Sequence, residues 1–179
     1  MSPQLFTEKL LPAAAAAAVK YGINPIGALA QSAIETGWGE HAPGNMYFGI
    51  KAGTSWKGKT QVLTTKEEVN GKTITVQSKF RAYSTPKESF LDYGKLISGN
   101  ARYKKALNYP DYDQSTDYIN AVAAAGYATA SSYASTVNNV STTIKKYVSR
   151  LDVERALQRA RTSFLPILVL CLFVFSKLH

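Results

Sequence analysis

The pattern of hydrophobic and polar positions predicts helices along most of the chain and one short β-rich segment near its middle. Apolar residues recur at the three-to-four-residue spacing of an amphipathic helix before residue 36 and again over 85–151. Between Thr60 and Tyr83 the pattern changes to two β-rich runs on either side of Asn70-Gly71, a pair typical of a hairpin turn. The sequence therefore predicts an α+β fold that is mostly α, with one small β-hairpin.

Capping residues give the expected boundaries of these elements. Serine, threonine, asparagine and proline favour helix starts, whereas glycine favours helix ends. We expect helix starts at Ser2-Pro3, at Pro12 (a restart), at Asn24-Pro25 and at the capping box Thr85–Glu88, with ends at Tyr21 and Glu35. We also expect a short helix after Ala101, a helix over Thr116–Ala125, a bulge near Ser78 in the hairpin, and a long last helix from Ser132 toward the C-terminus.

The C-terminal segment differs from the rest of the chain because it has no polar face. FLPILVLCLFVF, from Phe164 to Phe175, contains no charged residue. We predict that residues 162–179 form a transmembrane helix that anchors the protein in a lipid membrane, with the arginines just before it at the headgroups. The alternative is a buried core helix. This pattern divides the chain into a folded domain (1–150), a charged and solvated linking helix (151–161) and the anchor (162–179).

The charge balance points to an anionic partner. The 179 residues carry a net charge of +9, which suits an anionic membrane or an anionic polymer such as bacterial cell wall. The chain has no RNP-like motif, zinc finger or arginine-rich block, so we expect no nucleic-acid partner. Cys171 is the single cysteine, and the two histidines are far apart in the sequence. We therefore expect no internal disulfide, no metal site and no cofactor.

Glu35 is the first candidate for chemistry. It ends an apolar helical run and is followed at once by Gly37-Trp38-Gly39, which stops the helix. A carboxyl group against apolar and aromatic surface has a raised pKa, as a general acid near neutral pH requires. The alternative is a glutamate near a helix end that only faces water.

A second pair of carboxylates lies in the predicted hairpin. Glu67 and Glu68 come just before its turn, and a glycosidase needs an acid together with a base or nucleophile. The alternative is a charged, solvated hairpin. Aromatic side chains could stack on sugar rings in a cleft between the two lobes, although any one of them could instead be core. These candidates are Trp38, Tyr47, Phe48, Trp56, Tyr127 and Tyr133.

Several short motifs together resemble one enzyme family. They occur in the order AQSAIETGWG, FGIKA, WKG, TTKEEVNGK, FRAY followed by ES, ARY, and AGYAT with a later YA, from about Phe6 to Tyr147. This series closely resembles glycoside hydrolase family 73, the N-acetylglucosaminidase domains of bacterial autolysins, of the flagellar rod-cap hydrolase and of phage lysins. The resemblance implies a lysozyme-like fold and hydrolysis of the β-1,4 bond between N-acetylglucosamine and N-acetylmuramic acid in the glycan strands of peptidoglycan.

The resemblance also implies roles for individual residues. Glu35 matches the general acid of the family, and Glu67 the hairpin carboxylate, which activates water unless the substrate's own N-acetyl group assists. Glu68 replaces a usual aromatic residue. Tyr127 matches the tyrosine of the AGYAT motif, which the resemblance places in the cleft, and Phe48, Gly49 and Lys51 match the FGIKA loop. Together with the aromatic candidates Trp38, Tyr47 and Tyr133, we expect Phe48, Lys51 and Tyr127 to contact the substrate. The chain departs from the family pattern at Met46, where many members have asparagine, and at Ala130-Ser131, where an acidic residue and proline are usual.

The anchor changes the expected setting of such an enzyme. Residues 1–20 have no basic segment before their apolar run, so we expect a helix there and no signal peptide. We find no wall-binding repeat in the sequence. We therefore expect a membrane-anchored hydrolase associated with a phage virion, in the virion membrane or the host cell envelope, with virion proteins as partners, or else an unusual lysin. Two alternatives stay open: a lytic transglycosylase, and a non-catalytic wall-binding or structural virion membrane protein.

Overall fold

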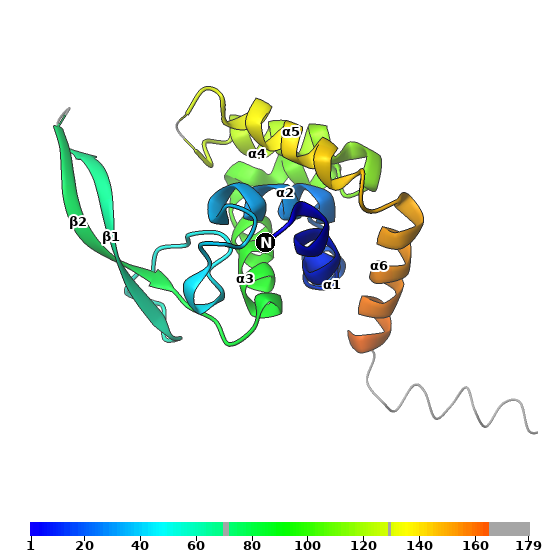
Figure 1. Ribbon diagram of the computed structural model, residues 1–179, viewed down its shortest axis with the longest axis horizontal. Coiled ribbons are helices and arrows are strands. Elements are labelled where there is room, and N and C mark those ends of the chain that lie inside the picture. Colours follow the sequence, from blue (N-terminus) through cyan, green and yellow to red (C-terminus); the bar gives the residue numbers. More distant parts are fainter. Residues whose placement is uncertain (70–71, 129, 165–179) are drawn as a thin grey trace, which may run out of the picture.

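The computed structural model describes residues 1–69, 72–128 and 130–164, and within 66–73 only the backbone of the strand residues. The hairpin and the last described helix lie at opposite ends of the long axis, with α1, α2 and α3 between them (Figure 1). The helices are α1 (Pro3–Tyr21), α2 (Pro25–Thr36), α3 (Pro86–Gly99), α4 (Ser115–Ala124), α5 (Tyr133–Ile144) and α6 (Arg150–Phe164). The strands are β1 (Thr60–Val69) and β2 (Lys72–Arg81), and the 3₁₀ helices are η1 (Pro43–Asn45), η2 (Ala101–Asn108) and η3 (Tyr112–Gln114).

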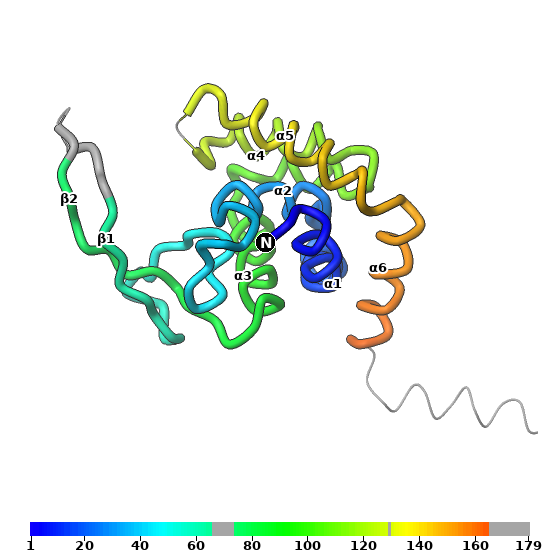
Figure 2. Tube along the Cα trace, in the orientation of Figure 1, coloured from blue at the N-terminus to red at the C-terminus, as the bar shows by residue number. Residues whose placement is uncertain are grey.

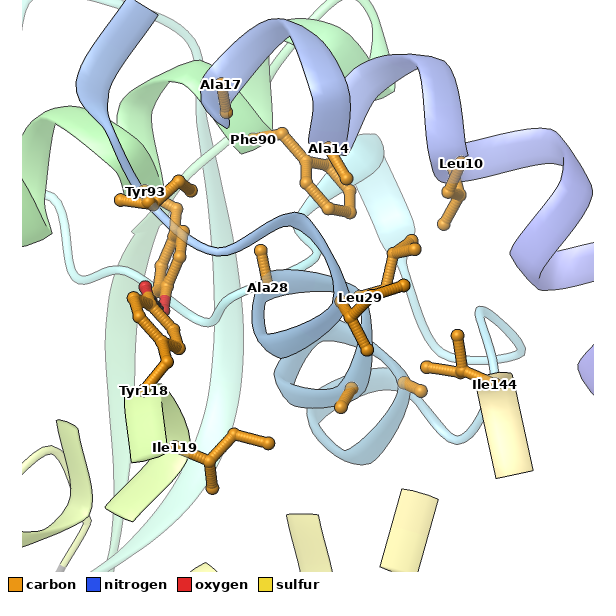
Figure 3. Close-up of a cluster of buried hydrophobic side chains, with 14 of the residues drawn as sticks. Leu10, Ala14, Ala17, Ala28, Leu29, Phe90, Tyr93, Tyr118, Ile119 and Ile144 are labelled. Atoms are coloured by element: carbon orange, nitrogen blue, oxygen red, sulfur yellow. Dashed lines mark hydrogen bonds between the residues drawn. The ribbon is translucent and has the colours of Figure 1, made fainter. Parts of the chain in front are cut away.

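α2 is the central helix of the body. Every residue from Pro25 to Ala33 is buried, so its small side chains meet neighbours on all sides. Figure 3 shows Ala28 and Leu29 of this helix surrounded by side chains of α1, α3, α4 and α5. Asn24 caps the start of α2, since its Oδ1 accepts a hydrogen bond of 2.9 Å from the Gly27 N–H. The C-terminal end of this buried helix carries Glu35, so the core fixes where that residue lies.

In α1, one predicted helix start is confirmed and the other is wrong. Its start at Ser2 is confirmed, because the Ser2 side chain accepts from the Leu5 N–H at 3.3 Å. Pro12, however, lies inside one continuous helix and does not restart it. The proline is exposed, so the carbonyl that loses its partner can lie toward water, and the buried alanines after Pro12 hold the helix together.

The hairpin is confirmed without the predicted bulge. β1 and β2 pair antiparallel in one register from Thr60 opposite Arg81 to Val69 opposite Lys72, and Ser78 pairs with Leu63. The prediction of a bulge was wrong because the apolar residues of β2 differ by even numbers of positions and already share one strand face.

The predicted last long helix is two helices. α5 ends at Ile144, and a new helix starts after Ser149. Ser149 and Asp152 bond each other reciprocally: the Ser149 N–H donates to Asp152 Oδ2 at 2.9 Å, and the Asp152 N–H to Ser149 Oγ at 3.2 Å. This pair of caps restarts the chain as α6, and the sequence Ser-x-x-Asp signals it.

α6 covers the segment predicted as a solvated linking helix. It is helical, but Val153 and Ala160 are buried, and Ala160 packs against Ala15 and Ala16 of α1. One face of α6 therefore belongs to the globular body. No helix within the described ranges is long and apolar enough to cross a membrane. Residues 165–179, most of the predicted anchor, lie outside the described residues.

Candidate active site

Glu35 lies in the last turn of α2, as the sequence predicts. The helix ends at Thr36 because Gly37 adopts a left-handed conformation with a φ of 56°. Trp38 also has a positive φ of 58°, and its N–H donates to the Ala33 carbonyl at 2.9 Å. The reversal of the chain at this point leaves Glu35 at the surface, where the helix ends and the loop begins.

Glu35 is an exposed residue whose carboxyl is nevertheless desolvated. The residue is exposed, and nearby protein still raises the pKa of its carboxyl above the ordinary range by desolvation. Both hold together, because protein can surround a group on several sides while water reaches it from another. Within the described part of the chain, no hydrogen bond or ion pair ties down this carboxylate. Exposure and a raised pKa are the properties that the predicted general acid requires.

Two predicted tyrosines lie close enough to Glu35 for its charge to act on their hydroxyls. The rings of Tyr127 and Tyr133 are stacked, with centroids 6.0 Å apart and an interplanar angle of 27°. Burial raises the pKa of both hydroxyls, and the negative charge of Glu35 raises it further. Tyr103 of η2 adds a third ring, 6.3 Å from Tyr127. The structure thus brings together Glu35, Tyr127 and Tyr133 from α2, the segment after α4, and α5.

The FGIKA loop is held in place by two buried aromatic side chains at its start. Tyr47 and Phe48 are each only 4% exposed. The Phe48 ring stacks on Tyr93 of α3 at 4.1 Å, and the Tyr47 ring lies 5.9 Å from Phe90. The structure therefore places these two rings in the core, with little surface to offer a sugar.

Gly49, in the same loop, approaches the acid directly. A β-carbon built on Gly49 would lie 3.8 Å from Glu35 Oε2. Lys51 is exposed and forms an antiparallel bridge with Phe80 of β2. Figure 2 shows this loop running beside the base of the hairpin, where Arg81 N–H donates to the Ile50 carbonyl at 2.8 Å.

The other predicted residues lie around this centre. The Trp38 ring is partly buried and meets Phe6 of α1 edge-on at 5.5 Å. In the hairpin, Glu67 pairs with Ile74 and Glu68 with Thr73 through the backbone. The side chains of both glutamates lie outside the described residues. Their reach toward Glu35 stays a prediction.

Sequence reasoning missed the polar network beneath the acid. Gln31, which is 1% exposed, bonds Tyr133 and Tyr93, and Tyr93 in turn bonds Tyr118. The available signal was a glutamine one helical turn before Glu35 within an otherwise apolar run. In the described ranges, no group of three or more His, Cys, Asp or Glu side chains could hold a metal ion.

A second missed cluster ties the hairpin to α3. Arg81 bonds both carboxylate oxygens of Asp92, at 2.9 and 3.1 Å, and the Tyr83 hydroxyl donates to Asp92 Oδ2 at 2.7 Å. The Arg81 guanidinium also covers the Trp56 ring at 4.8 Å. This cluster fixes the base of the hairpin on the helical body, and so fixes the strand that bridges to Lys51.

Comparison with known proteins identifies the family. The model of the family described as mannosyl-glycoprotein endo-β-N-acetylglucosaminidase matches residues 11–146. The chain belongs to this glucosaminidase family, glycoside hydrolase family 73. The predicted resemblance is confirmed, and α2 with Glu35, the hairpin and the tyrosine pair all lie within the matched residues.

Individual members of the glucosaminidase family show the same likeness. The peptidoglycan hydrolase FlgJ of Vibrio parahaemolyticus is 36% identical over 145 residues, which are 78% of this chain and 46% of that protein. The exo-glucosaminidase LytG of Bacillus subtilis is 32% identical over 152 residues, 80% of this chain and 51% of that protein. The structure of the glycoside hydrolase domain of Salmonella typhimurium FlgJ, C-terminally truncated, has a TM-score of 0.70 at 32% identity, covering 81% of this chain and 99% of that one. The chain spans about half the length of these curated relatives or less.

Proposed function

We propose that this protein hydrolyses peptidoglycan at the β-1,4 bond between N-acetylglucosamine and N-acetylmuramic acid. The observation that carries the proposal is Glu35, an accessible carboxyl whose pKa is raised by desolvation and whose neighbours are two tyrosines. Family membership supports the reaction class, because the relatives include a peptidoglycan hydrolase and a glucosaminidase. Peptidoglycan glycan strands are the proposed substrate.

In the proposed mechanism Glu35 is the general acid. Its carboxyl gives a proton to the glycosidic oxygen as the carbon–oxygen bond breaks, leaving an oxocarbenium-like sugar and a Glu35 carboxylate. The raised pKa keeps the carboxyl protonated at a higher pH than an ordinary glutamate. Glu67 is the proposed second carboxylate, which activates water unless the N-acetyl group of the substrate assists.

The structure favours some of the proposed substrate contacts over others. Tyr127 and Tyr133 lie beside Glu35 and are the proposed contacts nearest to the bond that breaks. Lys51 and Trp38 are proposed farther contacts, on the loop beside the hairpin and on the turn after α2. Tyr47 and Phe48 are buried, so we propose that they act by holding the backbone of the loop next to the acid.

The proposed setting is a membrane surface. Residues 162–179 are the proposed anchor, supported by the uncharged run from Phe164 to Phe175. α6 would connect the anchor to the enzyme as a packed helix, since Val153 and Ala160 are buried. Association with a phage virion and its proteins is a proposal that rests on the anchor alone.

The test of this function is the substitution Glu35→Gln. An amide cannot donate the proton, and loss of one acid typically lowers the rate by about 10²–10⁴-fold. We expect purified peptidoglycan suspensions treated with Glu35→Gln to stay turbid, while the matched control Glu40→Gln clears them like the wild type. Glu40 is also exposed and lies five residues later in the turn after α2. Circular dichroism checks that both variants are folded. Clearing by Glu35→Gln at the wild-type rate would remove Glu35 as the acid.

A further inference from the structure

Gln31 links the site to the core through two hydrogen bonds. It lies four residues before Glu35 on α2, so the two side chains are on the same side of the helix, one turn apart. The Gln31 Nε2 donates to the Tyr133 hydroxyl oxygen at 2.9 Å, and the Gln31 Oε1 accepts from the Tyr93 hydroxyl. The Gln31 amide therefore connects α3 to α5 in the core, one helical turn before Glu35.

The direction of these bonds follows from the buried tyrosines. The hydroxyls of Tyr93 and Tyr118 are 2.8 Å apart, both residues are fully buried, and Figure 3 shows the two hydroxyl ends close together. Because Tyr93 donates to Gln31, Tyr118 donates to Tyr93. If the Gln31 amide were flipped, its Nε2 would donate to the Tyr93 hydroxyl oxygen, and Tyr93 would have to donate its own proton to Tyr118. The Tyr118 proton would then have no acceptor among the described residues of a dry core, which buried donors avoid.

This direction leaves the Tyr133 proton without an acceptor among the described residues. Tyr133 accepts from Gln31, so its own O–H points elsewhere. Tyr133 is 9% exposed, at the edge of the core, and its ring is stacked on Tyr127. The negative charge of Glu35 raises the pKa of its hydroxyl. Burial raises the pKa of Tyr133, so the hydroxyl keeps its proton at neutral pH. Among the described residues, the titratable groups that interact with it are Glu35, Tyr103, Tyr118, Tyr93 and Tyr127.

We infer that Gln31 is a positioning residue, which turns the Tyr133 hydroxyl toward Glu35 so that it donates a hydrogen bond to the carboxylate formed when the acid gives up its proton. The inference rests on the proposed role of Glu35. Tyr133 keeps its proton throughout: the only proton that moves passes from Glu35 to the glycosidic oxygen as the carbon–oxygen bond breaks. The donor-to-acceptor direction of the hydrogen bonds that link Tyr118, Tyr93, Gln31 and Tyr133 thus matters for the rate of hydrolysis and not only for the stability of the fold.

The test uses Gln31→Met, Tyr133→Phe and the double variant, assayed for kcat across pH together with Tm. A hydrogen bond to the carboxylate favours its charged form and lowers the Glu35 pKa, so its loss should move the basic limb of the rate profile to higher pH. We expect each single variant to lower kcat about tenfold, the order of effect of one hydrogen bond to a charged group. The double variant should be no slower than the singles, because both remove the same interaction.

Ser141→Ala is the matched control, since Ser141 is also on α5 and its hydroxyl makes a buried bond of 3.1 Å to Ser115. It should lower Tm and leave the basic limb in place. Additive losses in kcat, or a limb that does not move, would overturn the inference. If Gln31→Met does not fold, Tyr133→Phe decides alone, because it keeps the stacked ring. If Glu35→Gln is inactive while these variants leave the limb unchanged, the inference fails and the proposed function stands; an active Glu35→Gln would contradict the proposed acid itself.

Discussion

Glu35 Oε2 lies 3.8 Å from the position that a β-carbon on Gly49 would occupy. Gly49 has a φ of 53°, in the left-handed region, so the loop passes the acid without a side chain. The distance is that of an ordinary van der Waals contact, which means that the backbone conformation, more than lack of space, requires glycine at this position.

This relationship predicts the outcome of Gly49→Ala. We expect the free energy of unfolding to fall by about 1–2 kcal/mol, the cost of a left-handed residue with a side chain, and activity to fall by much less than in Glu35→Gln. Urea denaturation gives the free energy. Gly53→Ala is the control, because Gly53 is in the same loop with open space around it and no left-handed φ. Equal losses in the two variants would mean that the Gly49 conformation carries no special cost.

The raised pKa of Glu35 predicts how stability depends on pH. Since the folded-state pKa lies above the unfolded value, the folded state binds the proton more tightly. The resulting stabilisation is complete below the unfolded pKa and is lost as pH rises through the folded pKa. Glu35→Gln should therefore have a Tm at pH 7 equal to or above that of the wild type, with the difference vanishing in acid. If the difference in Tm between Glu35→Gln and the wild type were more negative at pH 7 than at pH 4, the desolvation of this carboxyl would be contradicted. Because Glu35 is exposed, we expect a small difference.

The hairpin carboxylates predict two unequal substitutions. Successive residues of a strand face opposite sides, so we expect only one of Glu67 and Glu68 to be directed to the site. We expect Glu67→Gln to reduce wall lysis partially, and less than Glu35→Gln, while Glu68→Gln stays near wild type. The rate of clearing of peptidoglycan suspensions measures both. A larger loss at Glu68 would assign the second carboxylate to the other face of β1.

The contacts of Phe164 at the end of α6 show where the chain can be truncated to test the proposed anchor. Lys87 Nζ lies 5.2 Å from the centroid of the Phe164 ring, so contacts with the body continue to the last described residue. We expect a chain ending at Phe164 to be soluble and active on purified peptidoglycan, while the full-length chain floats with lipid vesicles. Burial of each large apolar side chain in lipid contributes roughly 1.5–3 kcal/mol. Aggregation of the shortened chain, together with a full-length chain that stays free of vesicles, would instead indicate a core segment.

Local signals in the sequence predicted much of the fold. Asn70-Gly71 between β-rich runs indicated the hairpin, and Thr85 capped α3 as expected, its Oγ1 accepting from the Glu88 N–H at 3.3 Å. Glu88 departs from the predicted box, since its carboxylate accepts from the Ser84 N–H and not from Thr85. The glycines after Tyr21 and Thr36 ended their helices because only a few residues supply a positive φ.

Features that depend on distant contacts could not be predicted in this way. Local preference gave Pro12 as a helix start, but the packing of the alanines after it favours one continuous helix. Tyr47 and Phe48 fit a sugar-binding loop by motif, and only their contacts with α3 show that they are core. Gln31 was identifiable as a polar residue in an apolar run, whereas its partners lie 62 and 102 residues away in sequence.

Mass spectrometry of the fragments released from purified peptidoglycan by the wild type and by Glu35→Gln shows directly which bond is cleaved and whether Glu35 is needed for cleavage. We expect fragments with N-acetylglucosamine at the reducing end from the wild type, and none from Glu35→Gln. Reducing N-acetylmuramic acid would mean that the enzyme cuts the other bond. Anhydro ends would show a lytic transglycosylase, and the absence of fragments from the folded wild type would contradict catalysis altogether.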